Sequence, residues 1–139
     1  MANILALEAA VNEHLLLFDT TLLIHEYTRQ TNLLRRIPRP QRFTSPLAVW
    51  EFVHLQNGQL IAHAERLERR DWMDRQEIRS TWVSVGAQHA FQTLLWHAHH
   101  TAGVVDCLLA AESLSRGWPL VTRNLRHFED IPGMLVVPY

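Results

Sequence analysis

Short apolar runs alternate with helical segments along this chain, and this alternation limits the fold more than any other feature. The first run, Leu15–Phe18, contains no polar residue and ends abruptly at Asp19. An uninterrupted run of this length is typical of a strand buried on both faces in a parallel sheet. Further strands are expected at 82–85, 119–122 and 135–137, with an extended pair at 104–105. This order of strands and helices predicts an α/β fold around a parallel sheet.

The predicted helices fill the segments between the runs, at 2–13, 22–28, 47–56, 59–70, 87–100 and 106–116, with a helical turn at 124–128. Ser45-Pro46 predicts a helix start, because serine caps a helix and proline suits its first turn. Asn57-Gly58 and Gly117 are expected to end helices. Residues 29–42 contain five arginines and two prolines but no acid, and are expected to form a basic connecting loop.

The composition predicts one folded domain over residues 1–139, with residues 1–14 as a helical extension. The chain is 47% hydrophobic and 19% charged, which is typical of a globular domain. A formal net charge of −1 argues against a protein that coats nucleic acid through bulk charge. A single cysteine, Cys107, excludes an internal disulfide and suits a reducing cytoplasm. No apolar run of about 18 residues and no signal peptide is present, so no membrane segment is expected.

Four polar residues stand where the pattern leads us to expect apolar residues or simple caps. Asp19 ends an apolar strand, Asn124 follows another, Asp106 begins a helix, and Glu51 lies on a mostly apolar helix face. Each has an ordinary alternative. Asp19, Asp106 and Asn124 could cap helices or turns, and Glu51 could be exposed or paired with an arginine. All four nevertheless lie at strand ends or on helices that could converge on one rim of the sheet.

Several oxygen ligands without a lysine are the donors that Mg²⁺ or Mn²⁺ prefers. Crowded carboxylates repel one another, so a divalent ion would relieve their charge. An ion in such a place can activate water and stabilise the attacking and leaving oxygens of a phosphodiester. The four residues therefore predict a site for a hard cation.

Four segments of the sequence resemble the PIN-domain family, and most closely its VapC-like toxin ribonucleases. These segments are Phe18-Asp19-Thr20-Thr21-Leu22-Leu23-Ile24, Ser45-Pro46-Leu47-Ala48-Val49-Trp50-Glu51-Phe52, Val105-Asp106-Cys107-Leu108-Leu109-Ala110-Ala111, and Leu120-Val121-Thr122-Arg123-Asn124-Leu125-Arg126-His127-Phe128 followed by Ile131-Pro132-Gly133. Their order and spacing agree with the family, so the resemblance covers roughly residues 15 to 139. The chain departs from the family in the 14 residues that precede the first strand.

The resemblance implies a three-layer α/β/α sandwich with a central parallel sheet, and a cytoplasmic endoribonuclease that depends on Mg²⁺ or Mn²⁺. It places Asp19, Glu51 and Asp106 as acidic ligands and Asn124 at the fourth position. Thr20 and Thr122 would orient the neighbouring acids. The resemblance further implies an RNA substrate, a VapB-like antitoxin that blocks the site, and a homodimer. Because asparagine lacks a charge, a second metal ion would bind more weakly.

Other functions stay open at this stage. The chain could be a catalytically weak PIN scaffold that acts by binding, as a co-repressor or an RNA adaptor, or it could cut DNA. The basic stretch could hold RNA phosphates or an antitoxin, or it could be a solvated loop. Arg123 could contact a phosphate or a partner, or form a surface ion pair. His97, His99 and His100 do not share one helix face, which argues against zinc, and Cys107 is expected to be a packed thiol. The candidate arginines are Arg29, Arg35, Arg36, Arg39, Arg42 and Arg123.

Overall fold

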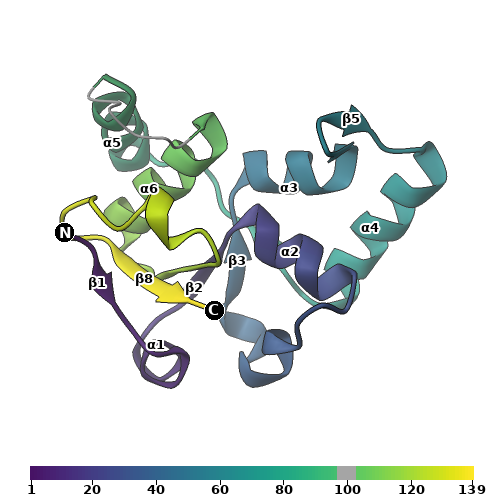
Figure 1. Ribbon diagram of the computed structural model, residues 1–139, viewed down its shortest axis with the longest axis horizontal. Helices are drawn as coiled ribbons and strands as arrows, with labels where there is room; N and C mark the ends of the chain where they lie inside the picture. The colour runs from purple at the N-terminus through teal and green to yellow at the C-terminus, as the bar shows by residue number, and fades with distance from the viewer. Residues whose placement is uncertain (97–102) are drawn as a thin grey trace.

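A six-stranded parallel sheet forms the centre of the molecule (Figure 1). The computed structural model describes residues 1–96 and 103–139. Within these residues the strand order is β1-β8-β7-β2-β3-β6, and every neighbouring pair is parallel. The strands are β1 (Asn3–Ile4), β2 (Leu16–Phe18), β3 (Arg42–Thr44), β6 (Arg79–Ser80), β7 (Leu120–Thr122) and β8 (Leu135–Pro138). The predicted α/β fold with a parallel sheet is confirmed.

Helices cover both faces of this sheet, with α5 and α6 on one side and α2, α3 and α4 on the other (Figure 1). The described residues also form three short 3-10 helices. The α-helices are α1 (Leu7–Glu13), α2 (Thr20–Tyr27), α3 (Pro46–His54), α4 (His63–Arg75), α5 (Val85–Trp96) and α6 (Val104–Arg116), and the 3-10 helices are η1 (Leu33–Arg36), η2 (Arg39–Gln41) and η3 (Leu125–His127).

Strand β2 shows why two helical layers are needed. All three of its residues are buried, and successive side chains point to opposite faces. Leu16 and Phe18 pack with residues of α1 to α4, whereas Leu17 packs with α6 and with the strands beside it. Each apolar face must be covered by its own set of helices. The sandwich predicted from the family resemblance is therefore the observed architecture.

The N-terminal segment differs from the single helix expected over residues 2–13. Its helix begins at Leu7, and residues 3–4 form β1 at the edge of the sheet. The Asn3 N–H donates to Met134 O at 2.7 Å, and the Leu5 N–H donates to Val136 O at 2.8 Å. Pairing with the open edge of β8 therefore determines the conformation, which a local helical pattern does not reveal.

Several element boundaries in the middle of the chain were predicted wrongly. Residues 42–44 form β3 rather than a loop, and residues 104–105 begin α6 rather than extend. The strand expected at 82–85 is absent there, and β6 comes earlier, at residues 79–80. Ser84 ends any extension at this point, because its Oγ accepts the Ala87 N–H at 3.1 Å at the start of α5. The helix expected over 87–100 is described as far as Trp96.

The ends of α3 follow local sequence signals. Ser45 Oγ accepts the Ala48 N–H at 3.1 Å, with Pro46 in the first turn, as expected. The helix ends at His54, and Asn57 and Gly58 then take positive φ values of 52° and 76°. These residues turn the chain between two short antiparallel strands, β4 (Leu55–Gln56) and β5 (Gln59–Leu60). Gly117 ends α6 at a φ of 70°, also as expected.

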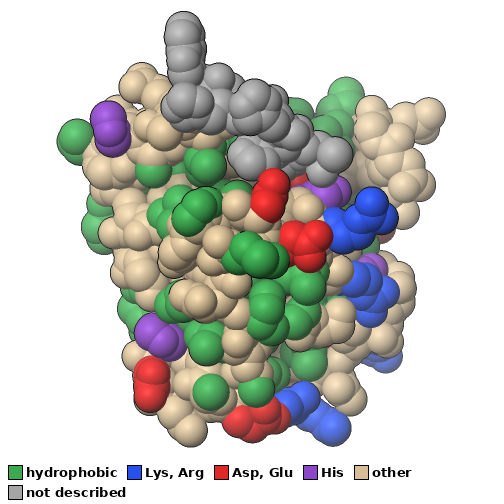
Figure 2. All heavy atoms as spheres, turned by 60° about the vertical axis from the view of Figure 1, so that its left-hand side comes forward, with side chains coloured by type: hydrophobic (Ala, Val, Ile, Leu, Met, Phe, Trp, Pro, Cys, Tyr) green, Lys and Arg blue, Asp and Glu red, His purple; other side chains and the backbone are tan. Residues whose placement is uncertain are grey.

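The surface is chemically mixed. On the face shown in Figure 2, hydrophobic side chains occupy much of the centre and basic side chains gather along one edge. Among the helices of the described ranges, none has both the length and the apolar character needed to cross a membrane.

Candidate functional site

The carboxyl ends of neighbouring strands bring the predicted site residues to one rim of the sheet. Asp19 directly follows β2, and Asn124 comes two residues after β7, the strand paired with β2. The chain proceeds from β2 toward β3 and β6 in one direction and places β7 and β8 in the other. Such a reversal of strand order opens a crevice at the carboxyl ends, where α/β proteins bind ligands.

A cavity of about 310 Å³ lies at this rim, and all four predicted residues line it. Asp19 and Asn124 reach it from the sheet, Glu51 from α3 and Asp106 from the first turn of α6. The lining contains no arginine or histidine among the described residues. The complete lining is Asp19, Thr20, Thr21, Ile24, Glu51, Gly103, Val104, Val105, Asp106 and Asn124.

Asp19 is the most deeply buried acid of the cavity, with 2% of its surface exposed. It occupies the N-cap position of α2, yet its side chain accepts no capping hydrogen bond. Its Oδ2 instead accepts the Thr122 hydroxyl at 2.6 Å. Burial raises the pKa of Asp19 to about 6, with smaller upward contributions from Asp106 and Glu51, whereas the bond from Thr122 acts in the opposite direction. Helix capping therefore does not explain this aspartate.

Asp106 is held by a residue that the sequence analysis did not select. It lies in the first turn of α6, where a negative charge suits the helix dipole, but the N-cap residue is Gly103. Its Oδ2 lies 2.7 Å from Nδ1 of His127, which comes from η3. His127 belongs to the segment that resembles the family, three residues after Asn124. Its place in that segment was the one feature of the sequence that could have drawn attention to His127. The sequence does not indicate that it contacts Asp106.

Asn124 is fixed by two hydrogen bonds to neighbouring threonines. Its backbone N–H donates to Thr122 Oγ1 at 3.0 Å, and its Nδ2 donates to Thr21 Oγ1 at 3.3 Å. Its side chain makes no capping bond to η3. No donor to its amide oxygen is found in residues 1–96 and 103–139, so this oxygen can accept a hydrogen bond beside the cavity. The Thr122 hydroxyl thus contacts both the Asp19 carboxylate and the Asn124 backbone.

Glu51 and Thr20 complete the polar lining. Glu51 is half-buried, and no ion pair to it is found within residues 1–96 and 103–139. The Thr20 hydroxyl is buried and lacks a hydrogen-bond partner in the described part of the chain. Within the described residues the Thr20 hydroxyl bonds no acid, and Thr20 contacts Asp19 through its backbone N–H instead. A buried hydroxyl without a partner is costly, so an unpaired oxygen beside the carboxylates indicates room for a polar ligand.

The donor set suits a hard cation, although the side chains do not form a closed cage. No group of three histidine, cysteine, aspartate or glutamate side chains in the described ranges is close enough to hold an ion by itself. Mg²⁺ does not require such a cage, because it usually keeps several waters and binds through one or two carboxylates. The buried Asp19, the partly buried Asp106 and the free Asn124 oxygen match that requirement.

The predicted basic stretch does not act as one surface. Arg36 pairs with Glu8, and Arg39 pairs with Glu77 at 3.3 Å. Arg42 is buried, and its guanidinium donates to the carbonyl oxygens of Ile37, Gln76 and Leu34 at 2.9, 2.7 and 2.6 Å. Arg42 therefore anchors the connecting segment within the protein, rather than facing a ligand.

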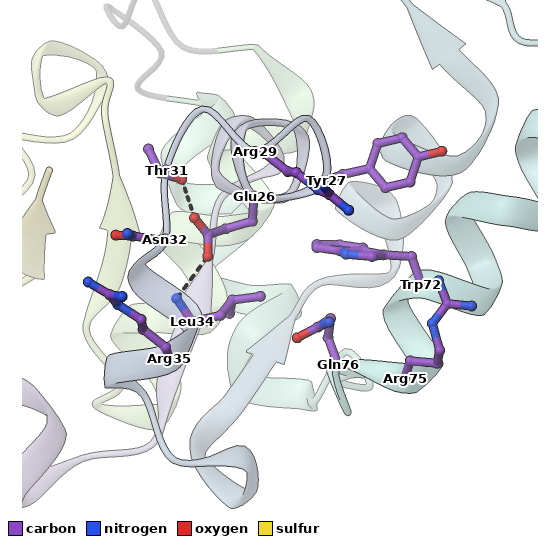
Figure 3. A pocket seen from close by; sticks show the side chains of 10 residues that line it. All are labelled: Glu26, Tyr27, Arg29, Thr31, Asn32, Leu34, Arg35, Trp72, Arg75 and Gln76. Carbon is purple, nitrogen blue, oxygen red and sulfur yellow. Dashed lines mark hydrogen bonds between the residues drawn. The ribbon is translucent and has the colours of Figure 1, made fainter.

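Arg29 and Arg35 line a separate cavity of about 650 Å³ between α2, η1 and α4 (Figure 3). One carboxylate, Glu26, belongs to its lining. Glu26 accepts hydrogen bonds from the Thr31 hydroxyl and from the backbone N–H groups of Leu33 and Leu34, the last at 2.8 Å. This carboxylate thus closes the loop after α2 and is not free for chemistry.

The sequence also drew attention to three histidines and to the single cysteine. His97, His99 and His100 lie outside the described residues. Cys107 is buried and forms no disulfide within the described residues. Burial raises the pKa of its thiol, and the negative charge of the adjacent Asp106 adds a smaller rise. A raised pKa keeps the thiol protonated and unreactive, in agreement with a packed cysteine.

Comparison with solved structures places this fold among several bacterial complexes. A toxin–antitoxin complex from Klebsiella pneumoniae is 24% identical, with 89% of this chain and 98% of that chain covered and a TM-score of 0.64. VapBC2 from Rickettsia felis bound to a promoter DNA fragment is 16% identical, with 88% and 97% covered and a TM-score of 0.65. FitAcB from Neisseria gonorrhoeae is 14% identical, with 89% and 96% covered and a TM-score of 0.60.

Comparison with curated proteins gave no match. The family model described as "PIN domain" matches residues 16–134, from β2 to the residue before β8. The acidic cavity, which is the one lined by Asp19, Glu51, Asp106 and Asn124, lies within this range. Thr20 and Thr122 also lie within it. The chain therefore belongs to the PIN domain family.

Proposed function

We propose that this protein is a metal-dependent endoribonuclease of the VapC type and the toxin of a toxin–antitoxin pair. The observation that carries this proposal is the cavity that Asp19, Glu51, Asp106 and Asn124 line together, with no arginine or histidine among its described lining residues. Membership of the PIN family and the fold shared with toxin–antitoxin complexes support it. A buried carboxyl group whose pKa is raised to about 6 is an arrangement that is frequent at functional sites.

Asp19 and Asp106 would hold Mg²⁺ or Mn²⁺, with Glu51 and the Asn124 oxygen beside it. When bound, such an ion would lower the pKa of a water molecule and stabilise charge that develops on the phosphate. Its positive charge would also oppose the effects of burial and of neighbouring carboxylates that raise the pKa of Asp19. The acidic residues would then remain ionised at neutral pH.

The remaining residues act by orientation. The Thr122 hydroxyl at the end of β7 donates to Oδ2 of Asp19. Because this bond fixes the carboxylate group, it also fixes the position of the other oxygen, Oδ1. Nδ1 of His127, in η3, forms a hydrogen bond with Oδ2 of Asp106 in α6, and this contact orients the Asp106 carboxylate. Thr21 fixes the Asn124 amide so that its oxygen is the free acceptor. Partners of this kind restrict ligand side chains to productive rotamers, and their loss in other metal sites costs about 10- to 100-fold in affinity or activity.

An antitoxin partner is proposed on the same basis. Large apolar side chains are exposed on α3, which also carries Glu51: Leu47 is 37% exposed and Trp50 is 50% exposed. A peptide bound there would lie beside the acidic cavity and could block it. The homodimer and the cytoplasmic location expected from the resemblance are retained as parts of this proposal.

A cleavage assay tests the enzymatic proposal directly. Purified protein is incubated with a mixed-sequence single-stranded RNA in Mg²⁺ or Mn²⁺, with EDTA as a control and with DNA in parallel. We expect cleavage of RNA that EDTA abolishes and Mn²⁺ restores. Asp19→Asn and Asp106→Asn should each reduce the rate by about 100-fold or more, because each removes a ligand charge.

Glu112→Gln is the matched control for these two variants. Glu112 is also fully buried, but it contacts Thr81 at 2.6 Å and does not line the cavity. Its variant should cleave RNA like the wild type. The enzymatic proposal would be contradicted if the Asp19→Asn and Asp106→Asn proteins cleaved RNA as fast as the wild type, or if the wild type showed no metal-dependent cleavage. A PIN scaffold that acts by binding would then describe the protein better. The neutral Asn124 at the fourth position is the observation that favours that alternative.

A further inference from the structure

The acidic cavity presents an electrostatic problem for a ribonuclease. Its lining contains three carboxylates and no arginine in the described part of the chain. An RNA strand carries one negative charge per phosphate, so unscreened carboxylates would repel the phosphates beside the scissile bond. A divalent ion can compensate charge only at the scissile group itself. The flanking phosphates therefore need positive charge from elsewhere on this rim.

A second cavity, of about 470 Å³, adjoins the acidic one and has the opposite charge. It is lined by Arg123, Asn124, Leu125, Arg126 and His127, and it shares Asn124 with the acidic cavity. Its lining includes two arginines and no carboxylate. Both arginines are exposed to solvent.

Neither guanidinium is neutralised by an acid within the described residues. Arg126 has no ion pair there, and Arg123 lies over the Tyr139 ring, 5.2 Å from its centroid. Contact with the ring restricts the Arg123 side chain without cancelling its charge. The segment that carries the two arginines is anchored on either side, because Thr122 Oγ1 accepts the Asn124 N–H at 3.0 Å and Phe128 is fully buried.

We propose that Arg123 and Arg126 form a binding subsite for a backbone phosphate of single-stranded RNA next to the scissile phosphate. This inference rests on the proposed ribonuclease function and adds the residues that position its substrate. Each planar guanidinium can donate two parallel hydrogen bonds to phosphate oxygens. Such contacts fix the register of the strand and carry no base specificity. The subsite therefore acts on any RNA sequence.

The test measures RNA binding separately from cleavage. A fluorescently labelled single-stranded RNA is titrated with the full-length protein in EDTA, where no cleavage is expected, at several NaCl concentrations. Arg126→Ala and Arg123→Ala should each weaken binding by roughly fivefold to tenfold at low salt. Each should also reduce the slope of log K against log salt by about 0.7, the value for one lost phosphate contact on a single strand.

Arg70→Ala is the matched control, because Arg70 is an exposed arginine on α4 and does not line either cavity at this rim. It should leave both the affinity and the slope unchanged. Arg126→Lys should restore most of the slope but only part of the affinity, because it keeps the charge and loses the planar fork. In the cleavage assay, the alanine variants should raise KM with little change in kcat.

Two outcomes separate this inference from the proposed function. Metal-dependent cleavage with unchanged RNA affinity and salt slope in both alanine variants would overturn the subsite and leave the ribonuclease intact. The opposite result is that the alanine variants bind RNA more weakly and with less salt dependence, while the wild type cleaves no RNA in Mg²⁺ or Mn²⁺. This result would support the subsite and contradict the enzymatic proposal. Circular dichroism of each variant should match that of the wild type, because both arginines are exposed.

Discussion

Single hydrogen bonds between distant residues hold two carboxylates of the acidic cavity in place. Thr122 contacts Asp19 although the two residues are 103 positions apart in the chain. His127 contacts Asp106 across 21 positions. Both contacts fix a carboxylate that would otherwise rotate, so the geometry of the proposed site also depends on residues other than the four proposed ligands.

The first prediction concerns the charge of Asp19. Its pKa rises from the ordinary 3.8 to about 6 on folding, so the folded protein binds a proton more tightly than the unfolded chain does. The contribution of this group to stability is therefore greatest at low pH and is lost as the pH rises through about 6. Asp19→Asn should remove that loss. Between pH 4 and pH 8, the free energy of unfolding should shift in favour of the variant by about 1–3 kcal/mol.

Denaturant unfolding of both proteins at each pH, in EDTA, measures this difference. Only the change with pH is diagnostic, because the amide also alters hydrogen bonding at every pH. A difference between the two proteins that stays constant from pH 4 to pH 8 would mean that burial does not raise this pKa.

The second prediction concerns Thr122. Thr122→Val keeps the shape of the side chain but leaves Asp19 Oδ2 and the Asn124 N–H without their partner. We expect a loss of about 1–3 kcal/mol in unfolding free energy and about 10- to 100-fold weaker binding of Mn²⁺. Calorimetric titration with Mn²⁺ measures the second effect.

Thr44→Val is the control for Thr122→Val. Thr44 is equally buried, and its hydroxyl donates to Phe18 O at 2.8 Å on the neighbouring strand. It should lose similar stability but bind Mn²⁺ like the wild type. If Thr122→Val and Thr44→Val bound Mn²⁺ with equal affinity, Thr122 would contribute to stability alone and not to metal binding.

Among the elements, helix α3 connects a local signal to the site. Ser45 caps it at the end of β3, and Glu51 lies on its second turn, facing the acidic cavity. The position of the cap therefore influences where that carboxylate lies. Helix α5 offers a comparison, because Ser84 caps it in the same way but none of residues 85–94 lines the cavity.

The third prediction compares these two caps. Ser45→Ala and Ser84→Ala should each cost about 1 kcal/mol in unfolding free energy, since each leaves a backbone N–H without its acceptor. Only Ser45→Ala should also lower the rate of RNA cleavage, because α3 carries Glu51. Thermal unfolding and the cleavage assay measure the two effects. A similar loss of activity in both variants would mean that general destabilisation, rather than the placement of α3, is responsible.

Considered as a whole, the molecule collects negative charge at one rim of the sheet. The formal net charge of the chain is only −1, yet Asp19, Glu51 and Asp106 share one cavity. Their mutual repulsion opposes folding, and a ligand that neutralises it in the folded state alone must stabilise the protein.

The fourth prediction is that Mg²⁺ or Mn²⁺ raises the melting temperature of the wild type. At ten times the dissociation constant the gain is about 1.4 kcal/mol. For a folded chain of 139 residues this corresponds to about 5 °C. Asp19→Asn should show no such shift, whereas Glu112→Gln should respond like the wild type. Differential scanning calorimetry at constant ionic strength measures it. The same shift in all three proteins would indicate a nonspecific salt effect.

The sequence by itself determined the features that depend on neighbours along the chain. The apolar runs of β2, β7 and β8, the Ser45-Pro46 start of α3 and the Gly117 stop were all readable locally, because periodicity and capping act within a few residues. The kinds of polar residue at the strand ends already indicated oxygen donors for a hard cation. Only the tertiary structure decided that residues 3–4 and 42–44 are strands, that Arg42 is buried, and that His127 holds Asp106. These outcomes depend on pairing between distant segments, for which a local pattern carries no information.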